Sequence, residues 1–153
     1  MKAFKFSLDR ALQLRERELK TEESALEHLL NQRVRMMDEM KALDVSLQQA
    51  RVSIQSQQFV RPAELVSLDR YNGRVARERK EWQSKIASHD AVVEKQRAKV
   101  VVARGGVRLL EKLREKRKLE WQAEGDKEME ELATDFSAAQ WLRLRERPAA
   151  QSN

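Results

Sequence analysis

The chain has 153 residues, enough for one modest domain, and a formal net charge of +6. Ala, Glu, Lys, Leu and Arg make up 84 of the 153 residues, a composition typical of long helices and coiled coils. With 41% hydrophobic and 37% charged residues, the chain is expected to form a narrow apolar seam rather than a thick core. The sequence has no cysteine, which excludes disulfides, thiolate zinc sites and cysteine nucleophiles.

The first predicted element is a helix over about residues 8–54, with Ser7 as its candidate N-cap. Between residues 8 and 50, thirteen positions alternate spacings of four and three, and ten of them are apolar. Such a pattern, sustained over about six heptads, predicts a coiled coil. The thirteen positions are Leu8, Leu12, Arg15, Leu19, Glu22, Leu26, Leu29, Arg33, Met36, Met40, Leu43, Leu47 and Ala50.

A turn over about residues 55–61 is predicted next, because the sequence is polar from residue 53 to 58 and Pro62 suits the first turn of a helix. The second helix is expected over about residues 62–145, followed by a frayed tail at 147–153. Whether Gly73 or Gly125 interrupts this helix is left open. Its predicted seam consists of Leu68, Val75, Trp82, Ile86, His89, Val93, Gln96, Val100, Ala103, Val107 and Leu110.

Two long helices with a short connection predict one all-α domain over residues 1–153, a long antiparallel coiled-coil hairpin with a projecting C-terminal helix. A turn near residue 58 pairs positions whose numbers add to about 117, and a second helix that starts only after Gly73 raises this sum by about ten. About 25 to 30 C-terminal residues then lack a partner in the first helix. Because an isolated amphipathic helix gains little stability, we expect this overhang to bind another protein; folding back at Gly125 and self-association are the alternatives.

The residues that usually carry chemistry are sparse. Gly105-Gly106 lies within a helical pattern without a nucleotide-binding fingerprint, and indicates either a close helix approach, which we favour, or a flexible joint in the stalk. His28 and His89 also have numbers that add to 117, but two imidazoles make an incomplete zinc site. A two-helix stalk offers no enclosed cavity to shift a carboxylate pKa. We therefore expect no enzyme, no metal and no cofactor.

Charge is distributed in blocks, which favours an interaction surface. Residues 97–118 hold nine basic and two acidic side chains, and residues 124–135 hold six acidic and one basic. No aromatic residue interrupts the basic block, so a stacking platform for nucleic acid is absent, and an acidic protein partner is favoured over a merely solvated face. The longest apolar run, Val100 to Ala103, is too short for a membrane span. Without an apolar signal core at the N-terminus, a cytoplasmic protein is expected.

The sequence resembles the FliJ family of flagellar type III export proteins over essentially its whole length. The resemblance rests on the run from Arg108 to Arg117, then Trp121, then Met129 to Ala133, and on the opening from Phe4 to Leu8. It implies a coiled coil similar to the central stalk of rotary ATPases, one end of which touches the hexameric export ATPase and promotes ring assembly. It also implies an export-gate contact at the hairpin end, the handling of substrate chaperones, and peripheral association with the inner-membrane export apparatus.

The resemblance assigns two sets of contact residues on what is expected to be a monomeric hairpin. The ATPase contact is Arg104, Arg108, Lys112, Arg114, Lys118, Trp121, Met129, Leu132, Phe136 and Trp141. The export-gate contact, near the turn, is Leu43, Leu47, Leu65, Leu68 and Tyr71. Three alternatives stay open: an unrelated cytoplasmic scaffold or tether that dimerises through the overhang, the equivalent stalk of a virulence type III secretion system, and a basic nucleic-acid-associated helical protein.

Overall fold

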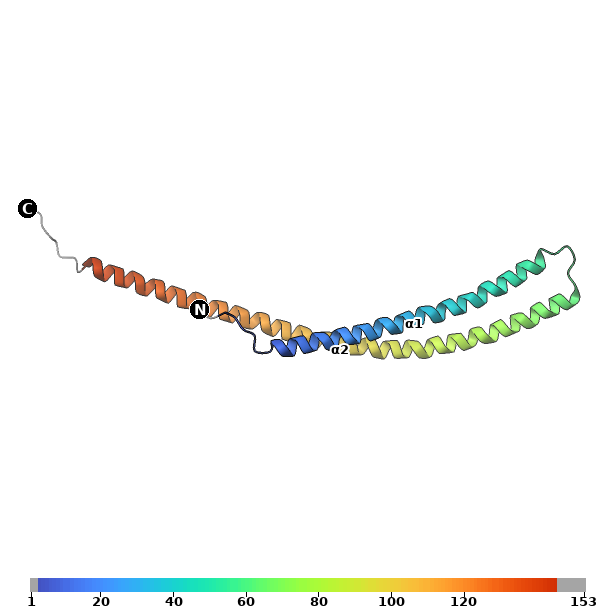
Figure 1. Cartoon of the computed structure of the whole chain (residues 1–153), viewed down its shortest axis with the longest axis horizontal. Coiled ribbons are helices and arrows are strands. Elements are labelled where there is room, and N and C mark those ends of the chain that lie inside the picture. The colour runs from blue at the N-terminus through green and yellow to red at the C-terminus, as the bar shows by residue number, and fades with distance from the viewer. Residues whose placement is uncertain (1–2, 146–153) are drawn as a thin grey trace, which may run out of the picture. The chain divides into compact units, whose positions relative to one another are not determined.

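A computed structural model of the chain describes residues 3–145, and the predicted tail at 147–153 lies outside them. Two helices account for nearly all of this range: α1, Asp9–Gln55, and α2, Pro62–Arg145 (Figure 1). Within residues 3–145 there is no strand. The all-α hairpin predicted from the sequence is confirmed, and the helix bounds agree with the prediction to within one residue.

The chain divides into two compact units, and each unit contains part of α1 and part of α2. One unit is Arg15–Gly105, and the other combines the segments Met1–Leu14 and Gly106–Asn153. In the unit Arg15–Gly105, α1 and α2 run antiparallel. Ser46 contacts Tyr71, Leu29 contacts His89, and Glu22 contacts Gln96. The residue numbers of these pairs add to 117 or 118, which confirms the predicted register.

The buried side chains of α2 recur at the heptad interval. Ile86, Val93, Val100 and Val107 are each seven residues apart, and Val75 lies eleven residues before the first of them. On α1, Leu12 is buried and the other predicted seam positions are half-buried, with the exception of the exposed Arg15. β-Branched residues at one seam position per heptad are typical of coiled coils.

Both helix starts have local causes. Pro62 occupies the first helical position of α2, where its missing N–H costs nothing. The backbone N–H of Arg61 donates to the Glu64 carboxylate at 3.1 Å, half of a capping box. The prediction of Ser7 as the N-cap of α1 is wrong. The Leu12 N–H donates to the Leu8 carbonyl at 2.9 Å, which makes Leu8 the cap, and the Ser7 hydroxyl instead accepts from Arg117 at 2.8 Å.

Glycines do not interrupt α2, which is continuous through Gly73 and Gly125. Of the pair Gly105-Gly106, Gly105 makes no close helix approach, because a Cβ placed there meets no atom within 4 Å. Gly105 faces open space, so nothing in its surroundings requires the residue to be glycine.

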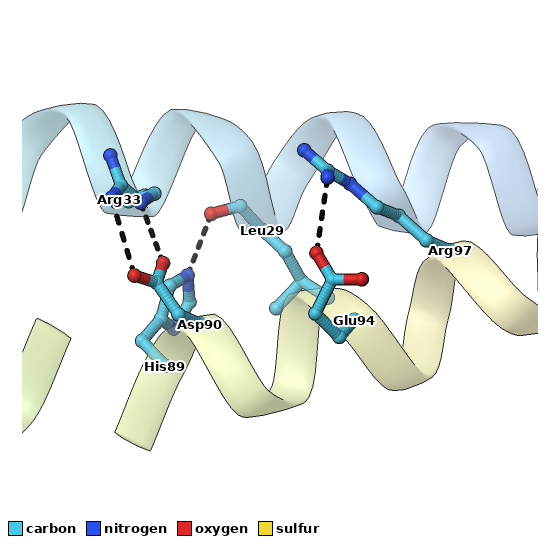
Figure 2. A network of polar contacts seen from close by, with 6 residues as sticks. All are labelled: Leu29, Arg33, His89, Asp90, Glu94 and Arg97. Atoms are coloured by element: carbon cyan, nitrogen blue, oxygen red, sulfur yellow. Dashed lines mark hydrogen bonds and ion pairs between the residues drawn. The ribbon is translucent and has the colours of Figure 1, made fainter. Parts of the chain in front are cut away.

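Polar residues interrupt the seam and are all paired. The Nε2–H of His89 donates to the Leu29 carbonyl at 2.7 Å, and the neighbouring Asp90 accepts two bonds from Arg33, at 2.6 and 3.2 Å (Figure 2). The buried Gln96 amide donates to the Glu22 carbonyl at 3.1 Å and also to its carboxylate. Because a slip of the helices leaves such groups unpaired, they favour a single register.

Candidate partner-binding surfaces

The C-terminal part of α2 carries an apolar face against which no other part of residues 3–145 packs. Every residue from 126 to 145 is exposed. At about 100° per residue, Met129, Leu132, Phe136 and Ala139 fall within an arc of about 80°. We call these four residues the C-terminal stripe. Leu132 is 63% exposed and Phe136 70%, so the stripe is a continuous apolar surface open to solvent.

The exposed part of α2 begins only after Gly125. The residues before α1 pack along α2: the ring of Phe4 lies 5.9 Å from that of Trp121, and Arg117 donates to Ser7. Trp121 is therefore covered, and the exposed stretch that the structure describes comprises the 20 residues 126–145. Since α2 runs straight through Gly125, no fold-back occurs within residues 3–145.

The two tryptophans of the predicted ATPase contact do not belong to the C-terminal stripe. Trp121 is half-buried against Phe4. Trp141 lies about 180° around the helix axis from Leu132, and the guanidinium of Arg145 sits 4.9 Å from its ring centre. Of the predicted apolar contacts, Met129, Leu132 and Phe136 share a face that is open to solvent.

The basic residues of the predicted ATPase contact are likewise spread over different faces. Arg104 is already engaged with Glu23 at 2.7 Å. Arg108 and Lys112 lie one turn apart, as do Arg114 and Lys118, but Lys112 and Arg114 are about 160° apart around the axis. In the part of the chain that the structure describes, these last four form no ion pair.

The predicted export-gate residues lie near the turn between the helices. Leu43, Leu47, Leu68 and Tyr71 are half-buried, and Leu65 is 53% exposed. The Tyr71 hydroxyl bonds the Ser46 hydroxyl at 2.9 Å. An open groove of about 390 Å³ lies between the helix ends, and of the five predicted residues it includes Leu68 and Tyr71. Its lining consists of Ala50, Ile54, Gln57, Arg61, Ala63, Glu64, Ser67, Leu68 and Tyr71.

The most exposed large apolar side chain near this groove was missed by the sequence analysis. Phe59 lies in the turn and is 86% exposed. The available signal was an apolar pair, Phe59-Val60, between Gln58 and Arg61 in a connection that otherwise reads as polar. An aromatic ring held in water at the tip of a hairpin gains nothing from folding, which makes Phe59 a candidate contact residue.

The ionisable groups form structural pairs. The hydrogen bond from Arg33 lowers the pKa of Asp90. His28 bonds Gln32 within α1 at 3.1 Å, whereas His89 bonds the Leu29 carbonyl, so the structure records no contact between the two histidines. Among the described residues there is no cluster of three or more potential metal ligands. Neither helix, over its described length, is apolar enough to cross a membrane.

Comparisons of the chain with protein-family models, with curated proteins and with solved structures found no match.

Proposed function

We propose that this chain is a non-enzymatic stalk of a type III protein export apparatus, similar to the FliJ family. In this proposal the C-terminal end of α2 binds the hexameric export ATPase and promotes its assembly. The turn end contacts the export gate, and the chain also binds substrate chaperones. The observation that carries the proposal is the C-terminal stripe, an apolar face on a helix that continues about 30 Å beyond its last packed residue.

The C-terminal stripe contributes nothing to the folding of the described chain, which indicates that it binds a partner. A helix that is solvated on all sides gains nothing from Leu132 and Phe136 on one face, and exposed apolar faces of this kind mark interaction sites. A single helix about 10–12 Å wide suits insertion into a ring opening better than a paired coiled coil does, because it is half as bulky.

The turn surface supports the second contact. Phe59, Leu65 and the open groove beside Tyr71 place apolar groups at the tip of the hairpin. Burial of these groups against the cytoplasmic part of the export gate leaves the seam between α1 and α2 undisturbed.

The test is direct binding to the export ATPase of the same organism, measured by interferometry with the ATPase immobilised. Leu132→Asp with Phe136→Asp puts two charges on the C-terminal stripe. Thr134→Asp with Ala138→Asp is the matched control, because it puts the same charges at the same spacing on the opposite face. We expect the first pair to lose binding and the control to keep it. Full binding by the stripe variant, or equal loss in both, contradicts the proposal.

The same variants address the scaffold alternative. A tether that dimerises through the overhang sediments as a dimer, and only the stripe variant reverts to monomer. The stalk proposal instead expects the wild-type chain to sediment as a monomer, with the stripe left free for the ATPase.

A further inference from the structure

The positions that border the C-terminal stripe carry charge of one sign. In the heptad that places Met129, Leu132, Phe136 and Ala139 on the seam, one border is Asp126, Ala133 and Gln140, and the other is Glu128, Asp135 and Leu142. Every charged residue on the two borders is therefore acidic. Lys127, the single basic residue between 124 and 135, falls on the far side of the helix.

These border carboxylates are uncompensated. Within residues 3–145, no ion pair or side-chain hydrogen bond involves Asp126, Glu128 or Asp135. Acidic residues here are neither caps nor partners of neighbouring side chains, so their arrangement along the stripe serves nothing within the described chain.

The ion pairs between α1 and α2 indicate which side chains pair with acidic residues beside a seam. Between α1 and α2 of the unit Arg15–Gly105, the cross-helix ion pairs each join an arginine to a carboxylate. They are Arg33 with Asp90 at 2.6 Å, Arg79 with Asp44 at 3.4 Å and Arg104 with Glu23 at 2.7 Å. Arg33 stands at a seam position, whereas Arg104 and Glu23 both border the seam, and charge pairs at such borders set partner choice and orientation in coiled coils.

We propose that the occupant of the C-terminal stripe is an amphipathic helix of another protein whose seam is bordered by lysine or arginine. This deepens the proposed function by naming the chemistry of the ATPase surface that receives α2, and in that respect rests on it. The apolar seam of the partner buries Leu132 and Phe136, and its basic borders meet Glu128, Asp135 and Asp126.

A second copy of this chain fits the stripe poorly. Two stripes packed against each other bring acidic borders together, and like charges at these positions are destabilising. A dimer that packs stripe against stripe is therefore disfavoured, and a helix with basic borders is the better complement.

The test uses two synthetic helical peptides of three heptads with the same leucine and isoleucine seam. One carries lysine and the other glutamate at every bordering position. Binding of each fluorescently labelled peptide to the full chain is measured by anisotropy at low and at physiological salt. Only the binding that Leu132→Asp with Phe136→Asp abolishes is assigned to the stripe.

We expect the lysine peptide to bind the stripe about five- to tenfold more tightly than the glutamate peptide, the preference that three exposed ion pairs of ordinary strength give. Higher salt shrinks this preference. Glu128→Lys with Asp135→Lys is expected to abolish or reverse it. Glu130→Lys with Glu131→Lys, an identical charge change on positions away from the borders, is expected to leave it within about threefold.

Equal affinity for the two peptides overturns the proposal, as does an equal effect of the two charge variants. Failure of the lysine peptide to bind at up to about 1 mM, the range of very weak recognition, also overturns it. A wild-type dimer that dissociates in the stripe variant assigns the surface to a second copy and overturns it too. Since no ATPase is present, a failure here leaves the proposed function standing, and a failure to bind the ATPase leaves this result unaffected.

Discussion

Two alanine substitutions, one in the seam and one in the C-terminal stripe, separate the residues that hold the hairpin together from those that bind a partner. Val93 is 3% exposed and Leu132 is 63% exposed. Both lie on apolar faces of α2, and they differ in whether another helix covers them. We expect Val93→Ala to destabilise the fold and Leu132→Ala to leave it nearly unchanged.

The magnitude follows from what each change removes. Val93→Ala deletes the equivalent of two buried methylene groups, about 1.6 kcal/mol by transfer, and the cavity left behind adds to this cost. The better helix propensity of alanine returns about 0.5 kcal/mol. The net loss in the free energy of unfolding is about 1–2.5 kcal/mol, or about 3–8 °C in Tm for a chain of this size. Leu132→Ala removes side-chain surface that is already mostly hydrated, so the expected change is within about 0.5 kcal/mol.

Thermal unfolding followed by circular dichroism at 222 nm measures both variants under identical conditions. Binding to the export ATPase is expected to show the reverse order, with Leu132→Ala impaired and Val93→Ala retained below its Tm. A Leu132→Ala variant that loses as much stability as Val93→Ala refutes the reasoning, because the stripe then packs against the chain itself.

Three further predictions concern single positions. The pKa of Asp90 is lowered by its hydrogen bond from Arg33, so the pair stabilises the fold above the unfolded pKa of about 4 and loses this contribution as pH falls through the lower folded value. The difference in Tm between wild type and Asp90→Asn is therefore expected to vanish in acid, and a constant difference from pH 2 to 6 argues against the pair. Gly105→Ala should raise the free energy of unfolding by up to about 1 kcal/mol in urea titrations, because the added Cβ meets open space. A lower free energy of unfolding would contradict the open surroundings of Gly105. Phe59→Ser should leave Tm unchanged, since the ring is 86% exposed, but weaken binding to the cytoplasmic part of the export gate in a pull-down; unchanged binding removes Phe59 from that contact.

The fold could be predicted from the sequence to within a residue at the helix ends, because a heptad pattern fixes both the helix and the face that it buries. Even the polar seam residues His89 and Gln96 fell at predicted seam positions. What failed were features set by tertiary contacts. Leu8 rather than Ser7 caps α1, and the Ser7 hydroxyl accepts a hydrogen bond from Arg117. Gly105 faces open space where the register suggested a close approach.

The candidate contact surfaces were harder to predict than the fold. Periodicity identified Met129, Leu132 and Phe136, but grouping them with Trp141 required ignoring the rotation of about 100° per residue. Phe4 lies in the non-helical segment before α1, so a helical pattern could not predict its contact with Trp121. Phe59 lies in a turn, where apolar exposure is visible only once the neighbouring packing is known.

The central claim, that this chain is a stalk for an export ATPase, is tested most directly by ATP hydrolysis of that enzyme titrated with the full chain, with ring formation followed by light scattering. The account predicts increased turnover together with more hexamers. It also predicts that Leu132→Asp with Phe136→Asp abolishes both effects and that Thr134→Asp with Ala138→Asp preserves them. Unchanged turnover and unchanged assembly at saturating concentrations of the wild-type chain contradict the account and favour a coiled-coil tether.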